Sequence, residues 1–169
     1  MNTMKWVDSN GGPLVFMPME VIATWGGIRR KGDRSTDYER ACAVKDEIGI
    51  IPSDVENANI VVLGDEPNRT AWFSKSSALV RWIWADNETA LLGALSILDK
   101  ASFVDTQLAV TVRGSGQWCL FDSAEAGSQV RGASDLVVLA RGNYRIFSCQ
   151  IDIGSSARIL VHRFRPWSN

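Results

Sequence analysis

The apolar residues of this chain occur in short runs that are separated by glycine, proline and polar residues. In the C-terminal part these runs are evenly spaced and rich in β-branched and aromatic residues, which is typical of β-strands. The pattern predicts strands at residues 107–112, 117–121, 136–140, 143–153 and 158–164. We expect the glycine-containing segments between them to join consecutive strands as in a meander or sandwich, with a hairpin turn at 141–143.

The N-terminal part combines strands with helical segments. Strands at residues 5–8 and 13–17 are expected to form a hairpin, because Gly11 and Gly12 permit the positive φ of a tight turn. Further strands are predicted at residues 48–51, 60–63, 71–74 and 79–85. The last of these alternates poorly between apolar and polar residues, so we expect it to be buried on both faces.

Two helices are predicted. The first begins at Pro18, which suits the first position of a helix, and it ends before Gly26. The second begins at Asp86, whose side chain is expected to cap it, and it buries a stripe made of Leu91, Leu95 and Leu98. Segment 37–42 is compatible either with a helical turn capped by Asp37 or with a strand.

Together these elements predict an α+β fold that is predominantly antiparallel β, with sandwich- or meander-like sheets and two short-to-medium helices. No flexible linker separates the α/β portion, about residues 1–100, from the all-β portion, about residues 101–169. We therefore expect a single domain over residues 1–169 with a shared core.

Charge is distributed unevenly along the chain. The net charge is −1, which argues against direct nucleic-acid binding, since that requires a dense basic surface. Between residues 46 and 68, however, there is no lysine or arginine, and the acidic residues are Asp46, Glu47, Asp54, Glu56, Asp65 and Glu66. These acids form either a partner-binding surface or a solvated face, and the sequence favours neither alternative.

Candidate catalytic groups are few. The only histidine, His162, lies within a predicted strand, and we interpret it as a half-buried structural residue. The carboxylate pairs Asp65/Glu66 and Asp122/Glu125 each follow a strand, where such residues usually organise turns. In the alternative hypothesis, a metal-dependent hydrolase, these four side chains would converge on one pocket. No zinc, calcium or phosphate-binding motif is present, so we predict neither enzymatic activity nor a cofactor.

The cysteines and the N-terminus indicate a cytoplasmic protein. Cys42, Cys119 and Cys149 are odd in number, widely spaced and set among apolar residues, which is typical of buried reduced thiols. The sequence contains neither a signal peptide nor an apolar run long enough to span a membrane.

Seven tryptophans raise a second functional alternative. If Trp82 and Trp84 share an exposed face, they form a stacking platform for a sugar or another small ligand on a β-sandwich. Most of the tryptophans are expected to belong to the core, with Trp25 and Trp167 as the exposed ones.

Several motifs follow one another along nearly the whole chain. They are Trp6-x-x-Ser9-x-Gly11-Gly12-Pro13-Leu14, Trp25-Gly26-Gly27, Asp37-Tyr38-Glu39-Arg40-Ala41-Cys42-Ala43-Val44, Val62-Leu63-Gly64-Asp65-Glu66-Pro67, Thr70-Ala71-Trp72, Val80-Arg81-Trp82, Leu120-Phe121-Asp122-Ser123-Ala124 and His162-Arg163-Phe164-Arg165-Pro166. Their order and combination resemble the immunity protein 21 family of bacterial polymorphic toxin systems.

The resemblance implies a protein that binds a cognate toxin and neutralises it by stoichiometric, non-catalytic inhibition. It carries over no catalytic residue. We expect a monomer or weak dimer that contacts the toxin but neither nucleic acid nor a membrane. The expected partner-binding residues are the six acids between residues 46 and 68, together with Trp25.

Overall fold

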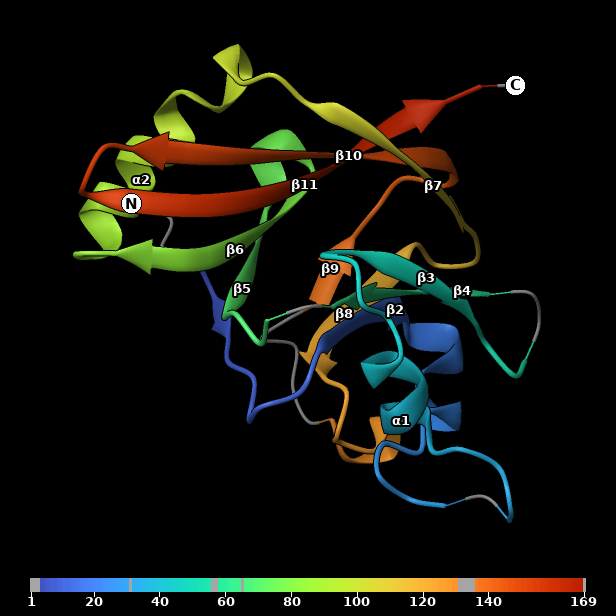
Figure 1. Cartoon of the computed structure of the whole chain (residues 1–169). Coiled ribbons are helices and arrows are strands. Elements are labelled where there is room, and N and C mark those ends of the chain that lie inside the picture. Colours follow the sequence, from blue (N-terminus) through green and yellow to red (C-terminus); the bar gives the residue numbers. More distant parts are fainter. Residues whose placement is uncertain (1–3, 31, 56–57, 65, 131–135, 169) are drawn as a thin grey trace.

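Two antiparallel sheets pack face to face, and helical segments lie against the outer face of each sheet (Figure 1). This arrangement comes from a computed structural model, which describes residues 4–30, 32–55, 58–64, 66–130 and 136–168. The β-rich, antiparallel architecture with few helices confirms the predicted fold class.

Each sheet is assembled from strands that are distant in the sequence. The six-stranded sheet has the order β1 (Trp6–Val7), β5 (Thr70–Phe73), β6 (Ala78–Ala85), β11 (Ala157–Trp167), β10 (Gly142–Ile153) and β7 (Val104–Val112). The five-stranded sheet has the order β3 (Gly49–Pro52), β4 (Asn59–Leu63), β2 (Leu14–Pro18), β8 (Gln117–Asp122) and β9 (Leu136–Val138). The helical segments are η1 (Met19–Thr24), α1 (Asp37–Cys42), η2 (Ser74–Ser76), α2 (Glu88–Ser96), η3 (Leu98–Lys100) and η4 (Gly127–Gln129).

The central strands are apolar on both faces because both faces are covered. On β2, Leu14 and Phe16 belong to the core between the sheets, whereas Val15 and Met17 pack with residues of η1 and α1. Successive side chains of a strand point to opposite faces, so this burial requires a continuous apolar run rather than an alternating pattern. A third apolar cluster lies between the six-stranded sheet and α2.

An aromatic group joins the two sheets at the centre of the molecule. The Phe16 ring of β2 lies 5.0 Å from the Trp118 ring, 5.7 Å from the Trp72 ring and 5.8 Å from the Phe164 ring, between centroids. These residues come from both the N-terminal and the C-terminal portions of the chain. We propose on this basis that the chain forms one domain with a shared core.

Several connections differ from the prediction. The expected hairpins at residues 9–12 and 141–143 are wrong, because each of these segments leads from a strand of one sheet to a strand of the other. The segment 114–116 likewise joins β7 to β8, which lie in different sheets. The connection at 154–156 does form a hairpin, in which Ile153 pairs with Ala157. A glycine supplies positive φ in either kind of connection, so its presence did not distinguish them.

Each of the helices α1 and α2 is capped by the sequence neighbour of the residue predicted to cap it. Segment 37–42 is a helix, and it is capped by Thr36 rather than by Asp37: Thr36 Oγ1 accepts a hydrogen bond from the Glu39 backbone N–H at 3.0 Å. Likewise α2 is capped by Asn87, whose Oδ1 accepts from the Ala90 N–H at 2.9 Å, and not by Asp86. Both types of side chain are good caps, so the pattern placed α2 correctly and its cap one residue away. For segment 37–42 the pattern left a helical turn and a strand open, and the structure has the helix.

Candidate partner-binding surface

A buried arginine joins two loops at one end of the sandwich, the loop before β3 and the loop after β4. Arg81 lies on β6, on the same face as the core residue Leu79, and is 1% exposed. Its Nη1 donates a hydrogen bond to the Glu47 carbonyl at 2.6 Å, and its Nη2 donates to the carbonyls of Gly64 at 2.8 Å and Glu66 at 2.5 Å. A buried guanidinium is costly without acceptors, so these carbonyls account for its position.

The loops that Arg81 joins also touch each other directly. Gly64 is buried, and a Cβ atom at this position would lie 2.4 Å from the Asp46 carbonyl oxygen and 2.8 Å from that of Val44. Real Cβ atoms do not approach backbone atoms so closely, so the contact requires glycine. The loop before β3 and the loop after β4 therefore form one joint surface.

Three of the predicted acids lie on this surface. Asp46 and Glu47 are exposed on the loop between α1 and β3, and Glu66 is exposed on the loop between β4 and β5. We refer to the two loops that carry these three residues as the acidic loops. Glu56 and Asp65 lie outside the described residues.

Asp54 does not belong to the acidic loops. It lies beyond Pro52, at the opposite end of the β3–β4 hairpin from Glu47, and its carboxylate is 3.3 Å from Arg40 Nη1. The same Arg40 nitrogen is 3.0 Å from Asp37, which is buried at the start of α1. The structure therefore divides what the sequence presents as one acidic segment.

Trp25 is not available to a partner. It is 2% exposed, its Nε1 donates a hydrogen bond to the Ser123 carbonyl at 3.0 Å, and its ring packs edge-to-face against Phe121. The prediction that Trp25 is exposed is therefore wrong, because a buried carbonyl satisfies the polar end of the indole. Trp167 is 39% exposed, which confirms the prediction for that residue.

Trp82, one of the two residues of the predicted stacking platform, is engaged within the protein. The Trp82 ring packs edge-to-face against Trp6 at 5.3 Å, and the guanidinium of Arg69 lies 5.3 Å from the first ring and 5.6 Å from the second. Trp82 also packs against the core beneath α2. These contacts give no support to a tryptophan platform for a sugar.

His162 is more deeply buried than expected. It is fully buried on β11, and its Nδ1 lies 2.7 Å from Ser148 Oγ. Burial, with a smaller contribution from the positive charge of Arg81, lowers the pKa of His162 to about 3. The imidazole is therefore neutral near pH 7 and inaccessible to a substrate, in agreement with a structural role.

Asp122 organises a turn, as predicted. It is 3% exposed, its Oδ1 accepts from the Ala124 N–H at 2.8 Å, and its Oδ2 accepts from the Asn10 N–H at 2.6 Å. Both oxygens are thus used within the fold, whereas Glu125 is exposed. Across the described residues, no three histidine, cysteine or acidic side chains gather closely enough to hold a metal ion.

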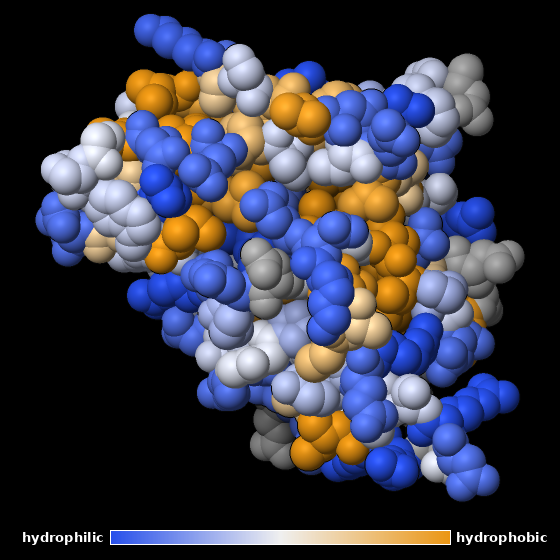
Figure 2. Space-filling model, in the orientation of Figure 1, coloured by the Kyte–Doolittle hydropathy of each residue, from blue (hydrophilic) through white to orange (hydrophobic). Residues whose placement is uncertain are grey.

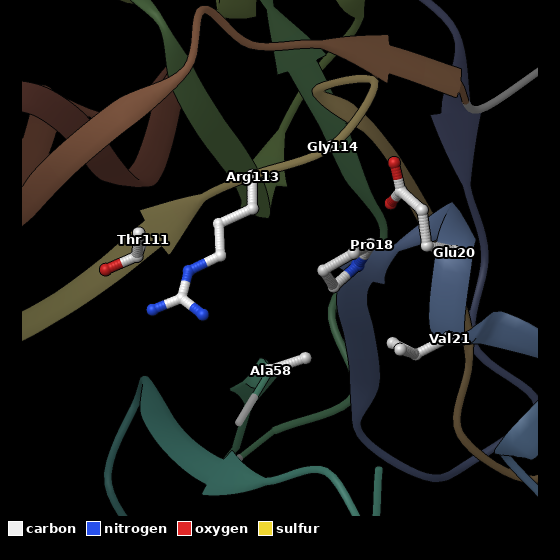
Figure 3. Close-up of a pocket in the computed structure, with 7 residues that line it drawn as sticks. All are labelled: Pro18, Glu20, Val21, Ala58, Thr111, Arg113 and Gly114. Atoms are coloured by element: carbon white, nitrogen blue, oxygen red, sulfur yellow. The ribbon is translucent and has the colours of Figure 1, made fainter. Parts of the chain in front are cut away.

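A pocket of about 390 Å³ opens where the end of β7 approaches η1 and the residue before β4 (Figure 3). Pro18, Val21 and Ala58 form its apolar part, and the Arg113 side chain extends across it. Glu20 is held at the rim by Ser115, whose backbone N–H and hydroxyl both donate to its carboxylate. Burial would raise the pKa of Glu20, but these hydrogen bonds outweigh it and leave the pKa below its usual value.

The role of Arg81 was not predicted from the sequence. The available signal was a single charged residue in the apolar run Leu79-Val80-Arg81-Trp82-Ile83. The acceptors that the described residues supply to it are backbone carbonyls, which carry no sequence signature, and so neither Glu47 nor Gly64 pointed to it.

The three cysteines are free thiols, and the predicted burial holds for two of them. Cys119 and Cys149 are buried and Cys42 is half-buried. Burial raises the pKa of Cys149 to about 11, although Arg163 and Arg165 act against this shift. No helix in the described ranges combines the length and the hydropathy that crossing a membrane would require.

Comparison with known proteins identifies one family. The model of the family described as Immunity protein 21 matches residues 5–157 of the chain. No curated protein and no solved structure matches it.

Proposed function

Because the chain belongs to the immunity protein 21 family, we propose that it binds a cognate bacterial toxin and neutralises it by stoichiometric, non-catalytic inhibition. The family match over residues 5–157 is the observation that carries this proposal. The protein acts in the cytoplasm, as a monomer or weak dimer, and protects the cell that produces it. The toxin belongs to a polymorphic toxin system and is encoded beside the immunity protein.

The acidic loops are the proposed contact surface. Their carboxylates are exposed, and the segment 46–68 contains no basic residue. Toxins that act on nucleic acids need a basic cleft, and an acidic surface accelerates association with such a cleft by electrostatic steering.

The anchoring of the acidic loops supports the same proposal. The Arg81 hydrogen bonds and the close contact at Gly64 hold both loops against the sandwich in the free protein. A surface that is already ordered loses less conformational entropy on binding, and this favours affinity.

The direct test uses the toxin domain encoded beside the immunity protein. The tagged immunity protein is used to capture that domain, and the affinity and stoichiometry are then measured by calorimetry. We expect tight one-to-one binding that abolishes toxin activity at equimolar concentration. Absence of binding, or inhibition only in turnover-dependent fashion, would contradict the proposal.

A further inference from the structure

Within the described part of the chain, α2 covers only one end of the outer face of the six-stranded sheet. The nine residues of α2 span about 14 Å, whereas the twelve residues of β10 span about 40 Å. Figure 1 shows α2 beside the turn between β10 and β11, while the opposite ends of both strands continue past it towards the C-terminus. Cys149 and Val161 pack beneath α2. Nearer the uncovered end, the outward-facing positions of β10 and β11 are occupied by a different group of side chains.

Those side chains are arginines interleaved with aromatic rings, and we call them the arginine face. Its members are Phe103, Arg145, Phe147, Arg163, Arg165 and Trp167. In the alternation of β10 and β11, the strand members share a face with Cys149 and Val161.

Each guanidinium of the arginine face lies over an aromatic ring. The distance from the guanidinium carbon to the ring centroid is 4.7 Å for Arg145 over Trp167 and 4.7 Å for Arg165 over Phe147. Arg163 lies 4.5 Å above Phe103 in the same way. Stacking fixes the plane of a guanidinium and leaves its N–H edges free to bind an acceptor that approaches in that plane.

Positive charge on this face is only partly neutralised. Arg145 and Arg165 are directly paired across β10 and β11, a like-charge arrangement that is unfavourable in the isolated protein. Arg145 has an ion pair with Asp105 at 2.9 Å and Arg163 has one with Asp99 at 3.2 Å. Within the described part of the chain, no carboxylate forms an ion pair with Arg165.

Planar, stacked and incompletely paired guanidinium groups are suited to carboxylates, which they bind through two parallel hydrogen bonds. Nucleic acid fits less well, because guanidinium groups already lie over the three rings on which bases would stack. We propose that the arginine face binds carboxylate side chains of the toxin, as a contact surface distinct from the acidic loops. This inference rests on the proposed function.

The test compares two double variants against the toxin domain encoded beside the immunity protein. Arg145→Gln with Arg165→Gln removes two charges and the ion pair with Asp105. The matched control, Lys5→Gln with Arg158→Gln, also removes two charges and one ion pair, the exposed pair of Arg158 with Asp152. Thermal unfolding of both variants establishes that they fold.

We expect the first variant to bind the toxin at least ~10-fold more weakly than the control, mainly through faster dissociation. Equal affinities of the two variants would overturn the proposal. If the wild-type protein itself does not bind the toxin domain, this result contradicts the proposed function and, with it, the proposed role of the arginine face.

A single substitution covers the case in which the double variant does not fold. Arg165→Lys keeps the charge, breaks none of the ion pairs found among the described residues and removes the planar group. We expect a clear loss of affinity for the toxin. Unchanged binding by this variant would overturn the proposal.

Discussion

Arg81 Nη2 donates a hydrogen bond of 2.8 Å to the Gly64 carbonyl, 17 residues away in the sequence. This bond links the six-stranded sheet to the loop that follows β4 in the other sheet. Arg81 also donates to the carbonyls of Glu47 and Glu66, and these bonds fix the positions of the two acidic loops relative to each other. One side chain thus serves both the packing of the sandwich and the arrangement of its acidic surface.

Replacing Arg81 with methionine tests the structural part of this role. The three carbonyls would lose their donor in a buried setting, so we expect the free energy of unfolding to fall by about 3 kcal/mol. Urea denaturation measures the change. The control is Arg158→Met, which removes an exposed ion pair and should cost less than about 1 kcal/mol. Similar losses in the two variants would show that Arg81 contributes no more than a surface arginine.

Substituting alanine at Gly64 tests the contact between the acidic loops. The added Cβ would overlap the Asp46 and Val44 carbonyls, and we expect a loss of about 2 kcal/mol. Gly93→Ala, within α2, is the matched control. The Cβ atom added there would lie 3.9 Å from Ile153, which is an ordinary contact distance. That change should stabilise the protein by about 0.5–1 kcal/mol, because alanine favours the helix. Opposite signs in urea denaturation are the expected result, and equal signs would contradict it.

The burial of His162 predicts a specific dependence of stability on pH. Its pKa is about 3 in the folded protein against 6.5 as the ordinary value, so only the unfolded chain takes up this proton between these limits. The stabilisation is complete above about pH 6.5 and is lost as the pH falls towards 3.

The measurement compares the wild-type protein with His162→Asn at pH 7 and pH 5. The wild type should lose about 2 kcal/mol more than the variant over this interval, because the remaining titrating groups are common to both. The same pH dependence in both proteins would show that folding does not lower the pKa of His162.

Reversing the charge of the acidic loops tests their role in toxin association. In the variant Asp46→Lys, Glu47→Lys, Glu66→Lys we expect association to slow by about 10-fold at low salt and its salt dependence to flatten. The control reverses three other exposed acids, Asp86, Glu88 and Glu125, and should change association less. Stopped-flow kinetics at several salt concentrations separate the outcomes, and identical rates for both variants would rule out steering by the acidic loops.

Much of the fold could be predicted from the sequence because burial leaves a local signature. The apolar runs of β2, β4 and β8 marked strands, and the leucine spacing marked α2. Which sheet a strand joins depends on pairing with distant residues, and a glycine turn permits either outcome. The pairing of β1 with β5 rather than with β2 is the clearest case.

The candidate site was predictable only in part, for a related reason. The acidic residues were visible as a segment, but the hairpin that places Asp54 far from Glu47 is a tertiary feature. Trp25 was misjudged because the acceptor of its N–H is the backbone of Ser123, almost a hundred residues later. The exposure of a residue does not follow from its type alone. On the face shown in Figure 2, hydrophobic residues reach the surface between the two sheets, among hydrophilic neighbours.

The repeated passage of the chain between the two sheets bears on how protection can be lost or inherited. Strands of the six-stranded sheet come from both ends and the middle of the chain, and those of the other sheet lie between them. A gene fragment that stops before β7, for example, would encode neither sheet in full. We therefore expect truncated copies to confer no partial immunity: a cell holds the whole coding sequence and is protected, or it holds a fragment and is not.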